Sequence, residues 1–319
     1  MTIDTIKKYI YGYQQTFSTV LRLTIYRQIA WRKAVHIIEN LAACLLRKPP
    51  PRYPPVIQVD ITNMCNLRCP GCLTGQKVYP TPPGMMDLGR FNACIDEVKA
   101  DTAIAILYNS GEPMLHPELV EMVTCLTKNR IASIVSTNGH FLASEKKAEQ
   151  LVRAGLSLLI VSLSGATQET YEQYHRGGRL DQVINGIQQL LEAKKKLNRR
   201  TPLIMLRLLI MDHNKHERGD MKKLAKHLAC DTIDIRYAKW QLKTLNRKTS
   251  AAFPQSFTPE YRRNKICLWP WLISVINWNG DVVPCCFYHL DLPKMGNAFG
   301  AEKLKGAWWG GAYTAFRGK

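Results

Sequence analysis

The feature that most constrains the fold is a regular alternation of short apolar runs and longer helical stretches. Six runs rich in aliphatic and β-branched residues predict buried strands at 56–61, 103–108, 131–136, 158–163, 203–211 and 232–237. Helical patterns lie between them, at about 87–99, 117–129, 144–154, 167–197 and 214–229. Strands that alternate with helices form a parallel sheet with right-handed crossovers. We therefore expect an α/β fold, a partial (β/α)6 TIM-like barrel, with its chemistry on the loops that follow the strands.

Three cysteines lie within eight residues, directly after the first predicted strand. Cys65, Cys69 and Cys72 have the spacing C-x3-C-x2-C, in a loop at the end of the apolar run. Such a loop can place three thiolates around one metal centre, and a four-iron, four-sulfur cluster held in this way keeps one iron open to a small molecule. The alternatives are a zinc site, which usually takes four ligands, and a disulfide, which is rare in reducing compartments.

Composition places the chain among folded, strongly basic proteins. Its 319 residues are 46% hydrophobic and 22% charged, with a formal charge of +19. A charge of this size favours anionic partners such as a membrane surface, a nucleic acid or an acidic peptide. The sequence shows no cleavable signal peptide and no apolar run near the roughly 20 residues that span a bilayer. We therefore expect a cytoplasmic protein whose thiols are reduced or bound to metal.

Residues 1–54 are predicted to form a separate basic arm. They carry nine lysines and arginines against two acidic residues, interleaved with apolar residues three or four positions apart. This pattern is typical of an amphipathic helix at the surface of an anionic membrane, and equally of an arm that packs on the barrel or on a second subunit. A nucleic-acid partner is not expected, because no recognised binding motif accompanies the charge. A proline-rich spacer at 49–55 marks a boundary, which gives an arm at 1–54, a core at 55–240 and a C-terminal region at 241–319.

The cysteine loop, with Asn66 and Leu67 behind its first cysteine, closely resembles the signature of radical S-adenosylmethionine (SAM) enzymes. The family often has an aromatic residue before the third cysteine, where this chain has Gly71. The resemblance implies that the three cysteines bind a [4Fe-4S] cluster and that SAM binds at its open iron. It also implies the reaction. An electron from a donor such as flavodoxin or ferredoxin cleaves SAM to methionine and a 5′-deoxyadenosyl radical, which abstracts hydrogen from a substrate C–H bond.

Polar turns after the second and third strands carry candidate SAM-binding residues. Gly111, Glu112 and Pro113 follow the second strand, where glycine permits close backbone approach and the carboxylate can accept from an ammonium group. The turn resembles the family's Gly-Glu-Pro motif, which implies that it holds the SAM amino group. Ser136 and Asn138, at the end of the third strand, also match the family pattern. Without the resemblance, both segments are ordinary turns.

The fourth strand and the helix after it carry the remaining SAM-binding candidates. The resemblance implies that Ser164, or Ser162, and Arg176 bind the ribose and carboxylate of SAM. The planar arginine side chain suits a carboxylate, because it can donate two parallel hydrogen bonds. A hydroxyl bonded within the strand end is an equally good interpretation of Ser162. The sequence does not select which side chain at the end of the sixth strand faces the interior: Arg236, Tyr237 or Lys239.

Two apolar runs around an Asn-Gly turn at 279–280 predict a hairpin over 272–286. The hairpin would bring three cysteines to one end: Cys267, Cys285 and Cys286. With Met-Gly-Asn at 295–297 beyond it, the segment resembles the auxiliary iron–sulfur module of the SPASM and twitch groups of radical SAM enzymes. The resemblance implies a second cluster held by these cysteines, beside the substrate pocket.

The C-terminal module departs from the family pattern. Such modules usually complete their cluster site with further cysteines, often a C-x2-C, beyond a segment like 308–317, and none follows before Lys319. Three interpretations stay open: a chain truncated at Lys319, a cluster completed by a non-cysteine ligand or by substrate, or a vestigial site. Cys286 is also a candidate structural neighbour, since adjacent cysteines rarely bind one metal together.

The sequence does not define the substrate. The resemblance implies an enzyme of oxidoreductase or transferase type, and the basic arm favours a membrane-associated substrate, a sugar or another small molecule. A ribosomally made peptide is the second interpretation. The third interpretation is a protein of another class, a non-catalytic basic adaptor whose fold is held together by bound metal. The turn at 111–113 argues against the adaptor, because a structural staple needs no SAM-binding turn.

Overall fold

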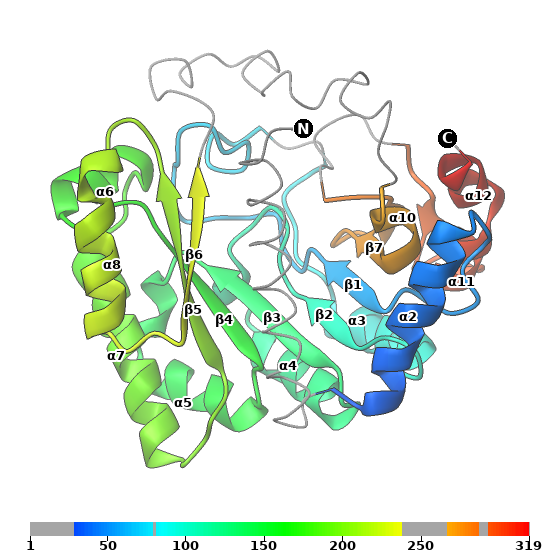
Figure 1. Cartoon of the computed structure of the whole chain (residues 1–319), viewed down its shortest axis with the longest axis horizontal. Coiled ribbons are helices and arrows are strands. Elements are labelled where there is room, and N and C mark those ends of the chain that lie inside the picture. Colours follow the sequence, from blue (N-terminus) through cyan, green and yellow to red (C-terminus); the bar gives the residue numbers. More distant parts are fainter. Residues whose placement is uncertain (1–28, 79–80, 238–266, 287–292, 319) are drawn as a thin grey trace.

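The computed structural model describes residues 29–78, 81–237, 267–286 and 293–318, which are organised around one sheet (Figure 1). The strand order is β6-β5-β4-β3-β2-β1-β7-β8-β9. The first six strands are parallel and follow each other in chain order, which confirms the open, partial barrel. Their bounds agree with the prediction to within two residues: β1 (Val56–Val59), β2 (Ile104–Ile106), β3 (Ala132–Thr137), β4 (Leu158–Leu163), β5 (Leu203–Ile210) and β6 (Thr232–Tyr237).

Helices connect these strands and cover one face of the sheet (Figure 1). Four of the predicted stretches each contain one helix: α3 (Leu88–Val98), α4 (Leu119–Lys128), α5 (Glu145–Ala154) and α8 (Arg218–His227). The prediction of one helix over 167–197 is wrong, because this stretch contains α6 (Gln168–Tyr174) and α7 (Leu180–Lys196). The chain turns between them at Gly177, whose φ of 80° suits glycine but not a right-handed helix. Short 3-10 turns complete the loops: η1 (Pro113–Leu115), η2 (His140–Leu142) and η3 (Lys215–Glu217).

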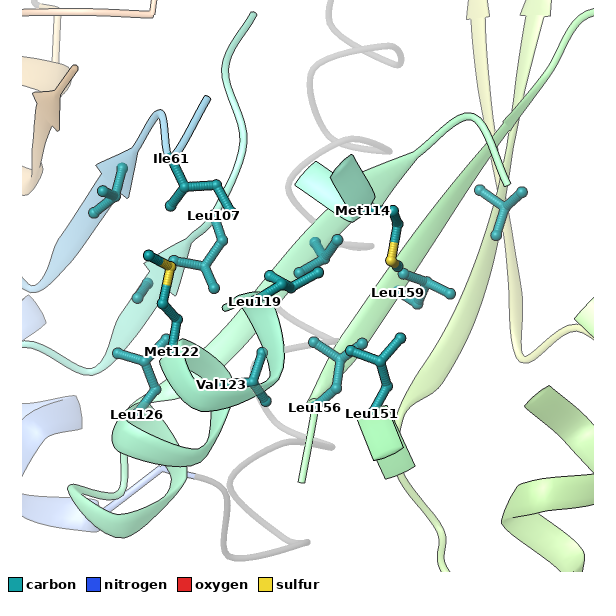
Figure 2. Packing of buried hydrophobic residues seen from close by; sticks show 14 of the residues in the cluster. Ile61, Leu107, Met114, Leu119, Met122, Val123, Leu126, Leu151, Leu156 and Leu159 are labelled. Atoms are coloured by element: carbon teal, nitrogen blue, oxygen red, sulfur yellow. The ribbon is translucent and has the colours of Figure 1, made fainter. Parts of the chain in front are cut away.

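Successive residues of each strand point to opposite faces of the sheet and feed two apolar layers. In β4, Leu159 and Val161 pack toward the helices, whereas Leu158 and Ile160 belong to the layer on the other face. Each fully buried aliphatic side chain stabilises the fold by about 1.5–3 kcal/mol. The helix-side layer contains more of these side chains than the layer on the other face, so it is the main core. Figure 2 shows part of it, in which side chains of α4 pack with their neighbours: Leu119, Met122, Val123 and Leu126 with Ile61, Leu107, Leu151, Leu156 and Leu159.

The face opposite these helices, which we call the inner face, changes character along the strands. Near the N-terminal ends of the strands it is apolar, with Ile29 packed against a layer of strand residues that includes Ile104, Ala132, Leu158 and Leu203. Near the C-terminal ends the same alternation places polar residues on this face: Ser136, Ser162, Arg207 and Asp234. The inner face therefore has an apolar floor and a polar upper rim beside the loops that carry the cysteine motif.

The described part of the basic arm is one helix, α2 (Trp31–Leu45), which packs on the core. The buried Lys33 ammonium group donates to the Asn129 carbonyl at 2.7 Å, at the C-terminal end of α4, where a cation is favoured. Further along, Asn40 donates to the Trp271 carbonyl at 3.1 Å, and Cys44 packs against the same tryptophan. The helical prediction is confirmed for this part of the arm, and residues 1–28 lie outside the described residues.

The opposite side of α2 exposes a row of large apolar side chains. Trp31, Ile38 and Leu45 are 68%, 67% and 64% exposed, and Val35 is 41% exposed. Because these four positions are separated by three, four or seven residues, they form one line along the helix, which we call the α2 stripe. Over the part of the chain that the structure describes, none of the helices combines the length and the apolar character needed to cross a membrane.

The C-terminal region continues the core sheet. β7 (Ile273–Ile276) pairs in parallel with β1, and β8 (Asp281–Val283) and β9 (Gly296–Asn297) extend the sheet with antiparallel pairing. The predicted hairpin is therefore confirmed, and its turn contains Gly280 at φ 87°. Three short helices accompany it: α10 (Trp269–Leu272), α11 (Lys303–Trp309) and α12 (Gly311–Arg317). The first part of the predicted C-terminal region, 241–265, lies outside the described residues.

The proline-rich segment lies between the core and the C-terminal helices. The indole N–H of Trp308 donates to the Arg52 carbonyl at 2.9 Å, and that of Trp309 donates to the Pro50 carbonyl at 2.8 Å. From the core side, the Thr102 hydroxyl donates to the Pro54 carbonyl at 2.8 Å. The segment predicted as a spacer is thus held on both sides, and it fixes the start of β1.

Candidate functional site

The three cysteines of the first motif lie in the loop that follows β1. Cys65, Cys69 and Cys72 are each half-buried. Burial raises the pKa of all three thiols, that of Cys65 to about 11, and the other two thiols raise the pKa of Cys69 further. No lysine or arginine of the described residues is among the groups that shift these pKa values. Thiolates here therefore need positive charge from a ligand, and the iron ions of an iron–sulfur cluster fit this donor set.

Backbone contacts fix the curl of the cysteine loop. The Cys72 N–H donates to the Cys69 carbonyl at 3.3 Å, and the Gln76 N–H donates to the Cys72 carbonyl at 2.9 Å. The Gly75 N–H lies 3.5 Å from the Cys72 sulfur and donates to it. A Cβ on Gly75 would lie only 2.7 Å from the Cys69 nitrogen, so the loop needs glycine there. Within the described segments, no group of three or more His, Cys, Asp or Glu side chains is gathered around a position for a metal ion.

The Gly-Glu-Pro turn lies directly against the cysteine loop. A Cβ on Gly111 would lie 2.1 Å from the Thr62 carbonyl oxygen, so only glycine permits this approach. The Glu112 N–H donates to the Met64 carbonyl at 2.8 Å. Pro113 then begins η1, where its lack of an N–H costs nothing. The structure therefore brings the second predicted motif into contact with the first.

Two buried carboxylates hold the loops around this contact. At the end of β1, Asp60 accepts hydrogen bonds from the N–H of Ser110, at 3.1 Å, and from its hydroxyl. The Glu112 carboxylate accepts three: from the Met114 N–H at 3.0 Å, the Thr137 hydroxyl at 2.7 Å and the Asn138 N–H at 2.7 Å. Because a carboxylate has about four acceptor positions, Glu112 keeps capacity for one further donor. Its hydrogen bonds to Thr137 and Asn138 nevertheless join the loop after β2 to the end of β3. The sequence did not reveal this connection.

Neither carboxylate has a cationic partner in the described part of the chain. Burial raises the pKa of Glu112 to about 7 and that of Asp60 to about 6, against the opposing effect of their hydrogen bonds. No lysine, arginine or histidine of the described residues is among the groups that shift either pKa. The site thus combines two buried carboxylates with three buried thiols and favours a cationic ligand.

Asn138 joins the end of β3 to the cysteine loop. Its side-chain nitrogen donates to the Asn66 side-chain oxygen at 2.8 Å and lies 4.0 Å from the Cys65 sulfur. Its side-chain oxygen accepts from the His140 N–H at 3.2 Å. Ser136, two residues earlier, lies on the inner face of β3 and is half-buried. The structure therefore places Asn138 at the first cysteine and Ser136 on the adjoining wall.

The two candidate serines of the fourth strand lie in different environments. Ser162 is on the inner face, in register with Arg207 of β5. Ser164 is fully buried, and its hydroxyl lies 2.5 Å from His175 Nδ1, with which it hydrogen-bonds. The Ser164 hydroxyl is therefore engaged within the core, whereas Ser162 lies on the inner face, and the SAM-binding role of either serine stays a prediction. The Arg176 side chain is exposed, while its carbonyl accepts from the Arg68 N–H of the cysteine loop at 3.1 Å.

Two tyrosines of α6, which the sequence did not single out, lie beside the cysteine loop. Burial and then the nearby Cys69 thiol raise the pKa of both Tyr171 and Tyr174. Tyr171 is fully buried and stacks on His175, with ring centroids 4.7 Å apart. The three-residue spacing of the tyrosines indicates a shared helix face, but nothing in the sequence says that this face meets the cysteines.

The C-terminal cysteines lie around the base of the hairpin. Cys267 is exposed, and Cys285 and Cys286 are half-buried. A hydrogen bond with Cys285, burial and the charges of Cys285 and Cys267 all raise the pKa of Cys286, so the hairpin brings the three thiols near one another. Cys44 of α2 lies on the same side, since burial and then Cys267 raise its pKa. The sequence does not reveal this neighbour of the C-terminal cysteines, because a contact between α2 and the hairpin is a tertiary one.

Comparisons with known proteins agree with this geometry. A sequence model of the radical SAM superfamily matches residues 59–225, which is more than half of the chain, and a model described as an iron–sulfur cluster-binding domain, SPASM, matches residues 267–319. Among curated relatives, a GTP 3′,8-cyclase of Limosilactobacillus fermentum is 33% identical over 135 residues, which cover 41% of this chain and 40% of the relative. A PqqA peptide cyclase of Gluconobacter oxydans is 26% identical over 262 residues, which cover 74% of this chain and 71% of the relative.

Solved structures show the same fold. SuiB of Streptococcus suis bound to the precursor peptide SuiA superposes with a TM-score of 0.65 at 13% identity, covering 88% of this chain and 70% of that one. BtrN in complex with AdoMet and 2-DOIA gives a TM-score of 0.52 at 20% identity, covering 84% and 87%. The two matched domains assign to this chain the cofactors of their class, a SAM-binding [4Fe-4S] cluster and an auxiliary iron–sulfur cluster. The chain belongs to the radical SAM superfamily and carries the SPASM type of C-terminal domain.

Proposed function

We propose that this chain is an enzyme that cleaves SAM reductively and removes a hydrogen atom from an unactivated C–H bond of a substrate. The observation that carries the proposal is the locked contact between the cysteine loop and the Gly111–Glu112 turn, at the C-terminal ends of parallel strands. When bound, the cluster and SAM supply the radical chemistry. The protein supplies the positions of these groups and the walls that exclude water.

The charges of the site support a role in holding SAM. Cys65, Cys69 and Cys72 would hold the cluster through three thiolates. Glu112 and Asp60 are buried without a cationic partner among the residues that the structure describes, and SAM brings an ammonium and a sulfonium group. The one acceptor position that Glu112 keeps would receive the ammonium group, next to the backbone of Gly111 and Pro113. A positive ligand would thereby relieve the cost of burying these carboxylates.

The remaining candidates surround the same position. Asn138 touches the cysteine loop, and Ser136 and Ser162 lie on the neighbouring inner faces of β3 and β4. We assign these hydroxyls to the ribose of SAM. Arg176 follows α6, and its backbone is bonded to the cysteine loop, so its exposed side chain would reach the SAM carboxylate. Cys267, Cys285 and Cys286 would hold the auxiliary cluster, which would take back an electron from the substrate radical or bind the substrate.

The α2 stripe supports a substrate or partner at an anionic membrane surface. An exposed line of Trp31, Val35, Ile38 and Leu45 beside Arg32 and Arg47 matches the pattern of an interfacial helix. The net charge of +19 provides attraction to anionic lipids. Replacing Trp31 and Ile38 by Ser should lower binding to vesicles rich in phosphatidylserine by at least about tenfold, with Ile134→Val of the inner face as the control. Equal binding by both variants would show that the stripe serves another purpose.

A peptide substrate is the second candidate. It is favoured by the similarity to a PqqA peptide cyclase over 74% of this chain and by the fold likeness to SuiB bound to its precursor peptide. A membrane-associated substrate and a peptide differ in the outcome of the vesicle experiment, because only the first requires the α2 stripe.

The radical reaction is tested without knowledge of the substrate. Anaerobically reconstituted protein is incubated with SAM and dithionite, and 5′-deoxyadenosine is measured by chromatography. We expect product from the wild type, none from Cys69→Ala, and wild-type amounts from Cys125→Ala, a half-buried cysteine of α4 on the helix side. Formation of 5′-deoxyadenosine by Cys69→Ala would show that the cysteine loop does not hold the SAM-binding cluster. No 5′-deoxyadenosine from the wild type would favour a non-catalytic adaptor in which metal has a structural role.

A further inference from the structure

The polar rim of the inner face contains a group of charged residues that the SAM site does not use. Arg207 of β5 is in register with Ser162 of β4 on one side and with Asp234 of β6 on the other. Arg236, two residues after Asp234, lies on the same face. With Tyr108, which follows β2, these residues form what we call the arginine cluster: Tyr108, Arg207, Asp234 and Arg236.

Both arginines share a single carboxylate oxygen. Arg207 Nε donates to Asp234 Oδ2 at 2.9 Å, and Arg236 Nε donates to the same oxygen at 3.0 Å. The Asp234 side chain is 9% exposed, whereas the Arg236 side chain is 61% exposed. The cluster therefore has two positive charges against one negative charge. A pair that served only to neutralise Asp234 would need one arginine.

The arginine cluster keeps hydrogen-bond donors that the shared carboxylate does not use. A guanidinium group has five N–H donors in a planar fork, and Asp234 receives one from each arginine through Nε. Burial lowers the pKa of Arg207, but its interactions with the neighbouring Tyr108 and Asp234 raise the pKa overall. For Arg236, the only hydrogen bond within the described residues is the one to Asp234. Such open forks fit the oxygen atoms of a carboxylate or a phosphate.

The cluster lies where a substrate of this enzyme would approach. Tyr108 is three residues before Gly111, and the Gln58 side chain fixes it by donating to the Tyr108 carbonyl at 2.8 Å. Since β3 and β4 lie between β2 and β5 in the sheet, the contact between Tyr108 and Arg207 bridges the inner face beside Ser136 and Ser162. The arginine cluster therefore lies on the inner face beside the proposed SAM pocket, with Arg236 as its solvent-exposed member.

We infer that the arginine cluster is the subsite for an oxyanion of the substrate, a phosphate or a carboxylate group. Arg207, which is held by Asp234 and Tyr108, is the fixed part of this subsite. Arg236 is the more exposed arginine and would close on the anion. This inference rests on the proposed function, because it assigns the substrate class to that site. It also explains the charge of the cluster, which SAM, with its own positive groups, would not require.

Calorimetric titration of the cluster-loaded full-length protein tests the inference, without dithionite so that no turnover is needed. The probes are inorganic pyrophosphate and succinate at equal ionic strength, which separate a preference for phosphate from one for carboxylate. We expect saturable binding of at least one probe, weakened at least about tenfold in Arg236→Gln. This variant leaves the buried Arg207–Asp234 pair intact, so it should fold. Arg207→Lys keeps the charge but loses the fork and should also weaken binding.

A matched control removes one positive charge from elsewhere. Arg153→Gln breaks an exposed ion pair of α5 with Glu149 and should bind the probes as the wild type does. Equal affinities of Arg236→Gln and the wild type, or the absence of saturable binding by the wild type, would overturn the inference. Competition between SAM and the probe would assign the cluster to the SAM carboxylate and would overturn it too. Because the titration does not involve SAM cleavage, its failure is distinguishable from a failure to form 5′-deoxyadenosine.

Discussion

The two groups of cysteines in this chain are held by the protein in different ways. The loop with Cys65, Cys69 and Cys72 is clamped by neighbouring loops, through the close approach of Gly111 and the amide of Asn138. The C-terminal thiols lie around the base of one hairpin, and Cys267 is exposed. The first site therefore has a shape fixed by the core of the fold, whereas the second depends on a hairpin joined to the core through β1 and β7.

The same contrast applies to the buried carboxylates of the two regions. Glu112 is held by neutral donors only, and burial raises its pKa to about 7. In the C-terminal region, Asp281 is 2.7 Å from the Lys294 ammonium group. Burial raises the pKa of Asp281, but hydrogen bonds from Lys294, Asn279 and Asn297 outweigh it and lower the pKa overall. A carboxylate that is to bind a cationic ligand, such as Glu112, has no cationic side chain beside it among the described residues. A carboxylate with a structural role, such as Asp281, is paired with a lysine of the protein.

The largest expected effect comes from filling the contact between the two core loops. Gly111→Ala places a Cβ 2.1 Å from a backbone oxygen, so one loop must move. We expect SAM cleavage to fall by more than about 100-fold, because small displacements of reacting groups are that costly. Chromatography of 5′-deoxyadenosine measures it. Gly219→Ala in α8, where a Cβ meets nothing within 4 Å, should retain activity. Full activity of Gly111→Ala would mean that the cysteine loop is less tightly clamped than the structure indicates.

An intermediate effect should separate the two cysteine sites. Cys285→Ala should lower the iron content of the reconstituted protein by about half, because one of two clusters is lost. The spectroscopic signal of the SAM-binding cluster, which shifts when SAM is added, should remain. Iron analysis and electron paramagnetic resonance together measure this. Loss of both signals would show that the sites are not independent, and unchanged iron would support the vestigial interpretation of the C-terminal site.

The smallest expected effect is a pair of opposite pH dependences. The raised pKa of Glu112 means that the folded state favours its protonated form, so this contribution to stability is present below about pH 4.5 and is lost as the pH rises through about 7. The lowered pKa of Asp281 acts in the other direction, with a contribution that is present above its unfolded-state pKa and is lost as the pH falls.

Denaturant unfolding between pH 6 and pH 8 measures the first of these slopes. Over this range the wild type should lose roughly 1 kcal/mol of stability relative to Glu112→Gln, because a pKa of about 7 lies in the middle of it. Asp281→Asn should be destabilised at neutral pH and should approach the wild type only as the pH falls below about 3.8. Parallel pH profiles of the wild type and Glu112→Gln would show that Glu112 is compensated by a charge in the folded protein.

The sequence was sufficient for the elements and motifs whose signals are local. Strand positions, the hairpin at Gly280 and the spacing of Cys65, Cys69 and Cys72 follow from periodicity and turn chemistry. The division of 167–197 into two helices was missed, because the helical pattern on both sides outweighed Gly177 and Gly178. A glycine pair inside a long periodic stretch was the signal that could have revealed it.

The details of the site were less predictable, because they depend on which strand face a residue occupies and on distant partners. Ser162 and Ser164 differ by two positions, yet the second has left the strand and bonds to His175. Arg236 faces Asp234, whereas Tyr237 lies near Arg218 of α8, with the guanidinium carbon 5.9 Å from the ring centroid. Two of the three partners of Glu112 are Thr137, at the end of β3, and Asn138, which follows it. Such contacts are set by the register of the sheet, which no single segment encodes.

The pairing of β1 with β7 has a consequence for the order in which the chain is made. β1 leads into the cysteine loop, and Val56 is in register with Ile273, far later in the sequence. During synthesis, β1 can pair with β2 but keeps its other edge open until the C-terminal region emerges, and such open edges promote aggregation. The C-terminal region is thus a covering strand for the catalytic core as well as a second cysteine site. Chains interrupted before β7 should therefore accumulate as insoluble protein, whether or not metal is supplied.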